Sequence, residues 1–175
     1  MTQRLRRMWM TIATGIALAM PVVAHATTAT AANEAISTFN AWCFKAGLTA
    51  DRMRANMEQA TTAPLPFALT FWDVSLEPVD FKPPLGVERR CEVAFDGDHT
   101  DKAIDALRVQ MATPPIFGSQ TELPETHTPL PETALIEGRA LPRNRVAIVH
   151  VGLRDGQTFM AVDRLFTNWK ERVQP

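Results

Sequence analysis

The residues best suited to do chemistry are His150 and Asp163, which a predicted β-hairpin brings together. Asp155-Gly156 is a strong signal for a two-residue hairpin turn. The resulting register makes His150 and Asp163 diagonal neighbours on one face of the hairpin. A carboxylate that orients an imidazole is the arrangement of a general base. The same pair can also form a structural hydrogen bond on a sheet surface, and we favour this interpretation because no nucleophile motif accompanies the pair.

The other candidate residues have weaker patterns. His127 lies in a proline-rich segment beside Glu122 and Glu125, and we expect it to be solvated, with a ligand or lid role as the alternative. The acidic run at residues 96–101 lacks the bidentate glutamate of a calcium loop, so it is interpreted as a turn and a helix cap. No zincin, P-loop or dinucleotide-binding motif occurs. The sequence therefore predicts no metal ion and no cofactor.

A charged face is predicted on the strand at residues 87–95, where polar and apolar residues alternate. One face of this strand presents Val87, Cys91, Val93 and Phe95, and the other presents Glu88, Arg90 and Glu92. We expect the second set, with His127 and the proline-rich loop at residues 113–132, to form a contact surface. Arg89 interrupts the apolar face, and we expect it to be ion-paired or to extend to solvent near a sheet edge.

The N-terminal segment has the three parts of a secretory signal peptide. A basic start precedes an apolar run, and the run ends at the small-x-small pattern of residues 24–26. We expect cleavage after Ala26, which leaves a flexible leader at residues 27–32 and a single domain at residues 33–175. The short, alanine-rich signal is typical of bacteria. The predicted compartment is therefore the periplasm, with secretion or an uncleaved anchor as the alternatives.

Cleavage of this segment changes the net charge of the chain. The full sequence has 18 basic and 19 acidic side chains, a formal charge of −1. Removal of three arginines and no acid leaves 15 basic and 19 acidic side chains, a charge of −4. A mildly acidic domain is not attracted to nucleic acid or anionic lipid. Neither nucleic-acid binding nor stable membrane insertion after cleavage is predicted.

The two cysteines of the chain are Cys43 and Cys91. In an oxidising compartment such a pair normally forms a disulfide. A redox or nucleophilic thiol lacks support, because there is no C-x-x-C spacing and no neighbouring histidine. We therefore predict a disulfide between Cys43 and Cys91 that links the first helix to the second strand.

Apolar periodicity predicts the element order α-α-β-β-α-β-β-β. The helices fall near residues 33–46, 50–61 and 98–111, and the strands near 67–76, 87–95, 133–141, 145–154 and 158–165. Tight turns between the late strands imply antiparallel pairing. The predicted fold class is α+β, a two-layer sandwich in which three helices lie mainly on one face of an antiparallel sheet of about five strands. The hairpin face that packs on the helices carries Val149, Val151, Leu153, Met160 and Val162.

No motif in the chain indicates a particular reaction. The functional prediction therefore depends on the predicted compartment and on the surface features described above. We expect an exported, non-catalytic binding or accessory protein of the cell envelope, with another envelope protein as its partner. The alternative is a small periplasmic hydrolase that uses His150 and Asp163, which requires a pocket that holds this pair with a hydroxyl or a second carboxylate. The oligomeric state stays open, as does the question whether the proline-rich loop covers the polar face of the sheet.

Overall fold

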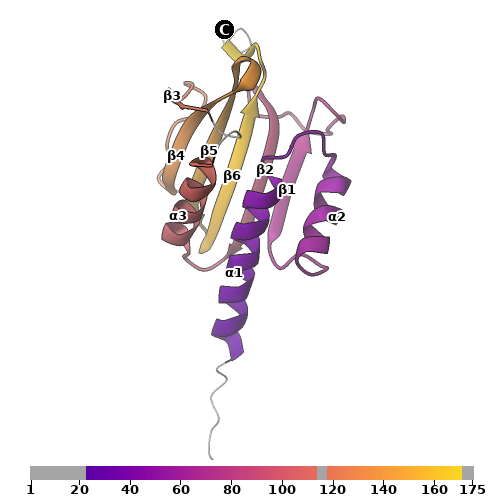
Figure 1. Ribbon diagram of the computed structural model, residues 1–175, viewed down its shortest axis with the longest axis vertical. Helices are drawn as coiled ribbons and strands as arrows, with labels where there is room; N and C mark the ends of the chain where they lie inside the picture. The colour runs from indigo at the N-terminus through magenta and orange to yellow at the C-terminus, as the bar shows by residue number, and fades with distance from the viewer. Residues whose placement is uncertain (1–22, 114–117, 171–175) are drawn as a thin grey trace, which may run out of the picture.

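The computed structural model describes residues 23–113 and 118–170 of the chain, in which three helices lie on one face of a single sheet (Figure 1). The sheet is antiparallel and six-stranded, in the order β1-β2-β6-β5-β4-β3. The elements are α1 (Val23–Trp42), α2 (Ala50–Ala60), β1 (Ala68–Asp73), β2 (Val87–Asp96), α3 (Thr100–Met111), β3 (Gln120–Thr121), β4 (Thr133–Leu141), β5 (Arg145–Arg154) and β6 (Gln157–Leu165). The predicted α+β class is confirmed. The sixth strand is β3, a two-residue strand inside the proline-rich segment. It is too short to show the alternation of apolar and polar residues by which the other strands were predicted.

The register of the β5–β6 hairpin is the predicted one. Arg154 pairs with Gln157, and Ile148 pairs with Asp163. Asp155 and Gly156 both have positive φ, at 52° and 77°. Two consecutive residues of this kind match the twist of a two-residue hairpin, and Gly and Asp tolerate that conformation better than branched residues do. The turn therefore determines which side chains share each face of the hairpin.

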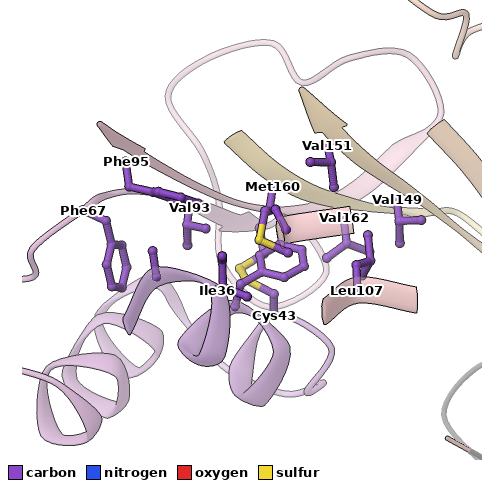
Figure 2. Close-up of a cluster of buried hydrophobic side chains, with 14 of the residues drawn as sticks. Ile36, Cys43, Phe67, Val93, Phe95, Leu107, Val149, Val151, Met160 and Val162 are labelled. Carbon is purple, nitrogen blue, oxygen red and sulfur yellow. A yellow bond between two sulfur atoms is a disulfide. The ribbon is translucent and has the colours of Figure 1, made fainter. Parts of the chain in front are cut away.

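The core lies between the sheet and the helices (Figure 2). Ile36 and Phe39 of α1 are buried against Val93 of β2 and Met160 of β6. The hairpin side chains that were expected to face the helices are buried there too, apart from Leu153, which is 37% exposed near the turn. Burial of an apolar side chain contributes about 1.5–3 kcal/mol relative to its exposure to water. This layer is therefore the main source of stability.

The ends of α1 differ from the sequence expectation. The helix begins at Val23, so residues 27–32, expected as a flexible leader, lie within it, and Ala32 is already buried in the core. The helix ends at Trp42 rather than at Gly47, and Cys43 occupies the turn that follows. Residues 1–22 lie outside the described part of the chain, so the signal peptide and its cleavage after Ala26 stay predictions.

The predicted disulfide between Cys43 and Cys91 is confirmed. It ties the turn after α1 to the middle of β2, where Cys91 is fully buried. A buried disulfide is typical of proteins that fold in an oxidising, extracytoplasmic compartment. Across residues 23–113 and 118–170, no helix combines the length and the hydropathy that a bilayer crossing requires.

A β-bulge at the start of β2 alters the predicted alternation of that strand. Val87 pairs with Leu165 while Arg89 pairs with Arg164, so Glu88 is the extra residue. Because a bulge shifts the side-chain period by one position, Val87 does not share a face with Cys91. It packs instead with Leu165 in a smaller apolar cluster on the face away from the helices. The prediction that both residues face the same way is wrong for this reason.

The disulfide should make a measurable contribution to the free energy of unfolding of the protein. It closes a 48-residue separation, for which the chain-entropy model gives about 4 kcal/mol. We expect the Cys43→Ala/Cys91→Ala protein to unfold at a lower urea concentration, with a free energy of unfolding lower by about that amount. Reduction of the unmodified protein is the matched control and should give a similar loss. An unchanged unfolding midpoint in both samples would show that the bridge does not stabilise the fold.

Candidate functional site

The face of the sheet away from the helices is covered, not open. An apolar cluster on this face includes Trp72, Ile148 and Leu165, and side chains from the flanking segments, Val79 and Leu123, pack against it. Beside this cluster lies a cleft of about 210 Å³. The cleft is lined by Pro84, Arg90, Thr126, His127, Thr128, Leu130, Glu132, Thr133, His150, Arg154, Phe159 and Asp163. The proline-rich segment thus forms one wall of a polar site.

The hairpin brings His150 and Asp163 into contact, as the register predicts. The distance from His150 Nε2 to Asp163 Oδ2 is 3.5 Å, and the Asp163 side chain is 2% exposed. His150 Nε2 and Asp163 Oδ1 are both buried, and neither has a hydrogen-bond partner among the described residues. Leaving a buried donor or acceptor unsatisfied costs about 1–3 kcal/mol. The pair therefore keeps unused bonding capacity at the centre of the site.

His127 completes the group, and the expectation that it is solvated is wrong. Its backbone N–H donates to the carbonyl of Pro124 at 2.8 Å, and this turn directs the ring into the protein, where the residue is 7% exposed. His127 Nε2 lies 3.3 Å from Asp163 Oδ2, and His127 Nδ1 lies 2.9 Å from the hydroxyl of Thr126. The rings of His127 and His150 have their centroids 5.8 Å apart. Both imidazoles therefore converge on one carboxylate.

The charged residues expected on the surface of β2 do not form a common exposed face. Glu92 is 8% exposed. It accepts hydrogen bonds from Arg90 at 3.0 and 3.2 Å and from Arg154 at 2.5 Å. Glu88 is separated from these residues by the bulge and accepts from Arg164 at 2.8 Å. Glu92 thus pairs with the half-buried Arg90 and the exposed Arg154 beside the histidines, whereas Glu88 lies apart, so the three residues of β2 do not share one face.

Asp163 is ionised despite its burial. Burial alone would raise the pKa of this carboxyl group, because a charge is poorly solvated inside a protein. His127 and His150 contact the carboxylate, and Arg90 Nη1 lies 3.6 Å from Asp163 Oδ2. Together these contacts outweigh the effect of burial and hold the pKa of Asp163 well below its usual value. The site thus contains a buried carboxylate that is ionised at neutral pH and faces two imidazole nitrogens.

Two imidazoles and a carboxylate are a ligand set for a transition-metal ion. His127, His150 and Asp163 each offer one donor atom, and these atoms lie within 4.8 Å of one another. The sequence predicted no metal ion, and no local spacing could have indicated this group, because the two histidines come from a loop and from β5. The hairpin register already predicted that His150 lies near Asp163. The position of His127 could not be predicted, because it depends on the fold of the proline-rich loop.

Comparison of the chain with protein-family models, with curated proteins and with solved structures gives no match. The function proposed below therefore rests on the geometry of the site.

The His127–Asp163 contact should hold the proline-rich loop against the sheet. We expect His127→Ala to increase the rate of proteolysis within residues 118–132 and to lower the free energy of unfolding by about 1–2 kcal/mol, because a buried hydrogen bond and a buried ring are lost. Hydrogen exchange and limited proteolysis measure the loop directly. Glu125→Ala changes an exposed residue of the same turn and should leave both quantities unchanged. Equal loop protection in the two variants would refute the role of His127.

Proposed function

We propose that this protein is a non-catalytic binding protein of the bacterial periplasm that holds a divalent transition-metal ion at His127, His150 and Asp163. The observation that supports the proposal is the convergence of three donor atoms from a loop and two strands. We use Zn²⁺ as the reference ion, because imidazole and carboxylate are common ligands of zinc.

The two distances from the histidines to Asp163 are those of a tetrahedral site. With metal–ligand bonds of about 2.0–2.1 Å, neighbouring donors of a tetrahedral zinc ion lie about 3.3 Å apart. His127 Nε2 and His150 Nε2 lie 3.3 and 3.5 Å from Asp163 Oδ2. An ion placed among these atoms would also satisfy His150 Nε2, which has no hydrogen-bond partner in the described part of the protein. Each histidine is therefore already at a suitable distance from Asp163 for both to bind one ion.

The two arginines beside Asp163 donate their hydrogen bonds to Glu92 rather than to Asp163, although Arg90 stays within ion-pair distance of it. Arg90 is the nearest positive group, but two of its guanidinium nitrogens donate to Glu92. Its third nitrogen lies 3.6 Å from Asp163 Oδ2, which is too long for a hydrogen bond. Arg154 is likewise bound to Glu92. Glu92 thus holds both arginines, and Asp163 Oδ1 stays free of any described partner.

A hydroxyl group orients one of the ligands. Thr126 Oγ1 lies 2.9 Å from His127 Nδ1, the ring nitrogen that faces away from Asp163. A second hydrogen bond of this kind fixes the orientation of a metal-binding imidazole. Three protein ligands beside a cleft also leave a fourth coordination position for water or for a group from a bound molecule. The arrangement suits a protein that carries or presents a metal ion.

Two features support the proposed compartment. The disulfide requires an oxidising environment, and the basic start and apolar run of residues 1–26 have the pattern of a signal peptide. The periplasm combines both features. A metal carrier there would exchange its ion with another envelope protein, which is the partner class that we propose.

Metal binding is tested by titrating zinc chloride into protein that has been stripped with a chelator. We expect one equivalent to bind by isothermal titration calorimetry, and His127→Gln or His150→Gln to weaken binding by more than about tenfold, since each removes one of three ligands. Zinc should also slow hydrogen exchange in residues 118–132, because it ties the loop to β5 and β6.

The control variant is His99→Gln. His99 stacks on Phe95, with ring centroids 6.0 Å apart, and is not part of the donor group. Its zinc affinity should equal that of the unmodified protein. The proposal fails if zinc does not bind, or if the His127→Gln and His150→Gln proteins bind it as tightly as the His99→Gln protein.

A hydrolase that uses His150 and Asp163 is the second candidate function. It is favoured by the hydroxyl of Thr126, which contacts His127 Nδ1 while His127 Nε2 contacts Asp163. Hydroxyl, imidazole and carboxylate in series are the groups of nucleophilic hydrolysis. For a binding protein we expect p-nitrophenyl acetate to be hydrolysed no faster than by the His127→Gln variant. Turnover that is lost in both His127→Gln and His150→Gln would instead establish the hydrolase.

A further inference from the structure

A second cavity lies on the opposite face of the sheet, beneath the turn that follows α1. Its volume is about 190 Å³. Phe44 from that turn, Leu141 from the end of β4 and Val162 from β6 provide an apolar wall. Three arginines also line it, namely Arg89, Arg145 and Arg164, and we call the cavity the arginine pocket. An apolar cavity with several guanidinium groups has the composition of a site for an anion with a hydrocarbon body.

The arginines differ in how far they are already satisfied. Arg164 donates to Glu88 at 2.8 Å and to Asp73 at 2.9 Å, so its guanidinium is committed to two carboxylates. Asp73 also accepts from the hydroxyl of Ser75 at 2.6 Å. These contacts use both oxygens of Asp73. Arg164 is thus a structural member of the pocket.

Arg89 is buried without adequate partners. The residue is 5% exposed, and its Nε and Nη2 atoms have no hydrogen-bond partner among the described residues. The closest approach to Asp73 is 3.9 Å, from Nε to Oδ2. The guanidinium otherwise faces the ring of Phe71, 5.0 Å from its centroid. A buried guanidinium with unused donors is a costly arrangement in a protein interior.

The local environment lowers the pKa of Arg89 but does not remove its positive charge. Burial, followed by repulsion from Arg164, lowers the pKa of Arg89 to about 10. The side chain is therefore still a cation near neutral pH. Arg89 is ion-paired as expected, at a long distance of 3.9 Å from Nε to Asp73 Oδ2. It does not reach solvent, and its Nε has no hydrogen-bond partner among the described residues.

The charges around the pocket leave a surplus of one positive charge. Three guanidinium groups line it, and the carboxylates that contact them are those of Asp73 and Glu88. Within the described residues, Arg145 takes part in no ion pair. One further negative charge would neutralise the group. A ligand with a single carboxylate supplies that charge and two hydrogen-bond acceptors in the planar geometry that guanidinium prefers.

We propose that the arginine pocket binds a small monocarboxylate with an apolar body. Arg145 donates hydrogen bonds to the carboxylate, and the buried donors of Arg89 reach it once that side chain turns toward the cavity. The apolar body packs on Phe44, Leu141 and Val162. The proposal does not depend on the metal site, because the pocket opens on the other face of the sheet. It assigns a ligand class to Arg89, a buried arginine whose Nε and Nη2 have no hydrogen-bond partner among the described residues.

The test uses benzoate and hexanoate as probes, with benzamide and hexanamide as neutral partners of nearly the same shape. Binding is measured by two-dimensional NMR titration of the full chain in the presence of a chelator, so that a carboxylate on a metal ion cannot contribute. We expect saturable shifts at residues that line the pocket, and amides that bind at least about tenfold more weakly, because a charge-assisted hydrogen bond is lost.

Two variants localise the site. Arg145→Gln removes a half-buried cation at the start of β5, and Arg89→Met removes the buried one. Each should weaken benzoate binding by about tenfold or more. Arg143→Gln is the matched control, since Arg143 is an exposed arginine of the adjoining turn that does not line the pocket. His150→Gln should bind benzoate normally, which separates this site from the metal site.

The proposal is overturned if neither carboxylate binds saturably up to about 10 mM, or if the amides bind as tightly as the acids. It is also overturned if Arg145→Gln binds benzoate as tightly as Arg143→Gln does. If the Arg89→Met protein does not fold, Arg145→Gln and the comparison of acid with amide still decide the question.

Discussion

The buried carboxylate of Asp163 is the constraint on which the covered face of the sheet depends. A carboxylate in this position is stable only if hydrogen bonds and positive charges replace its hydration. Those contacts come from the loop through His127, from β5 through His150 and from β2 through Arg90. Satisfying one charge therefore positions three separate parts of the chain. His127 joins the proline-rich loop to this carboxylate, in addition to the pairing of β3 with β4 and the packing of Leu123.

The parts of the fold that could be predicted are those that depend on neighbours in the sequence. The Asp155-Gly156 turn has two residues with positive φ, and a two-residue turn leaves a single register for the strands that it joins. The contact between His150 and Asp163 followed from that register alone. The disulfide followed from the number of cysteines and the predicted compartment. The turn leaves one register for the hairpin, and two cysteines leave one possible disulfide, so each prediction had few alternatives.

The parts that could not be predicted depend on contacts between distant segments. Nothing in the local pattern of β2 indicates that β6 lies beside it, so the approach of Arg90 to Asp163 was not foreseen. The bulge at Glu88 depends on pairing with β6 as well, and it moves both Val87 and Glu88 to faces that simple alternation does not give. His127 is the clearest example. Its burial depends on a turn at Pro124 and on a partner 36 residues away, and neither is visible in the loop sequence.

Two consecutive residues of β6 have opposite charges and lie on opposite faces of the sheet. Asp163 faces the histidines, whereas Arg164 faces the arginine pocket, because successive side chains of a strand alternate. Replacing a whole buried ion pair by packed apolar side chains is often neutral or stabilising, whereas removing one partner alone is destabilising. Stability alone therefore does not explain the unsatisfied donors of Arg89 or the free atoms of His150 and Asp163. The ligands that we propose would complete those bonds, and each face has a cavity beside its unsatisfied groups.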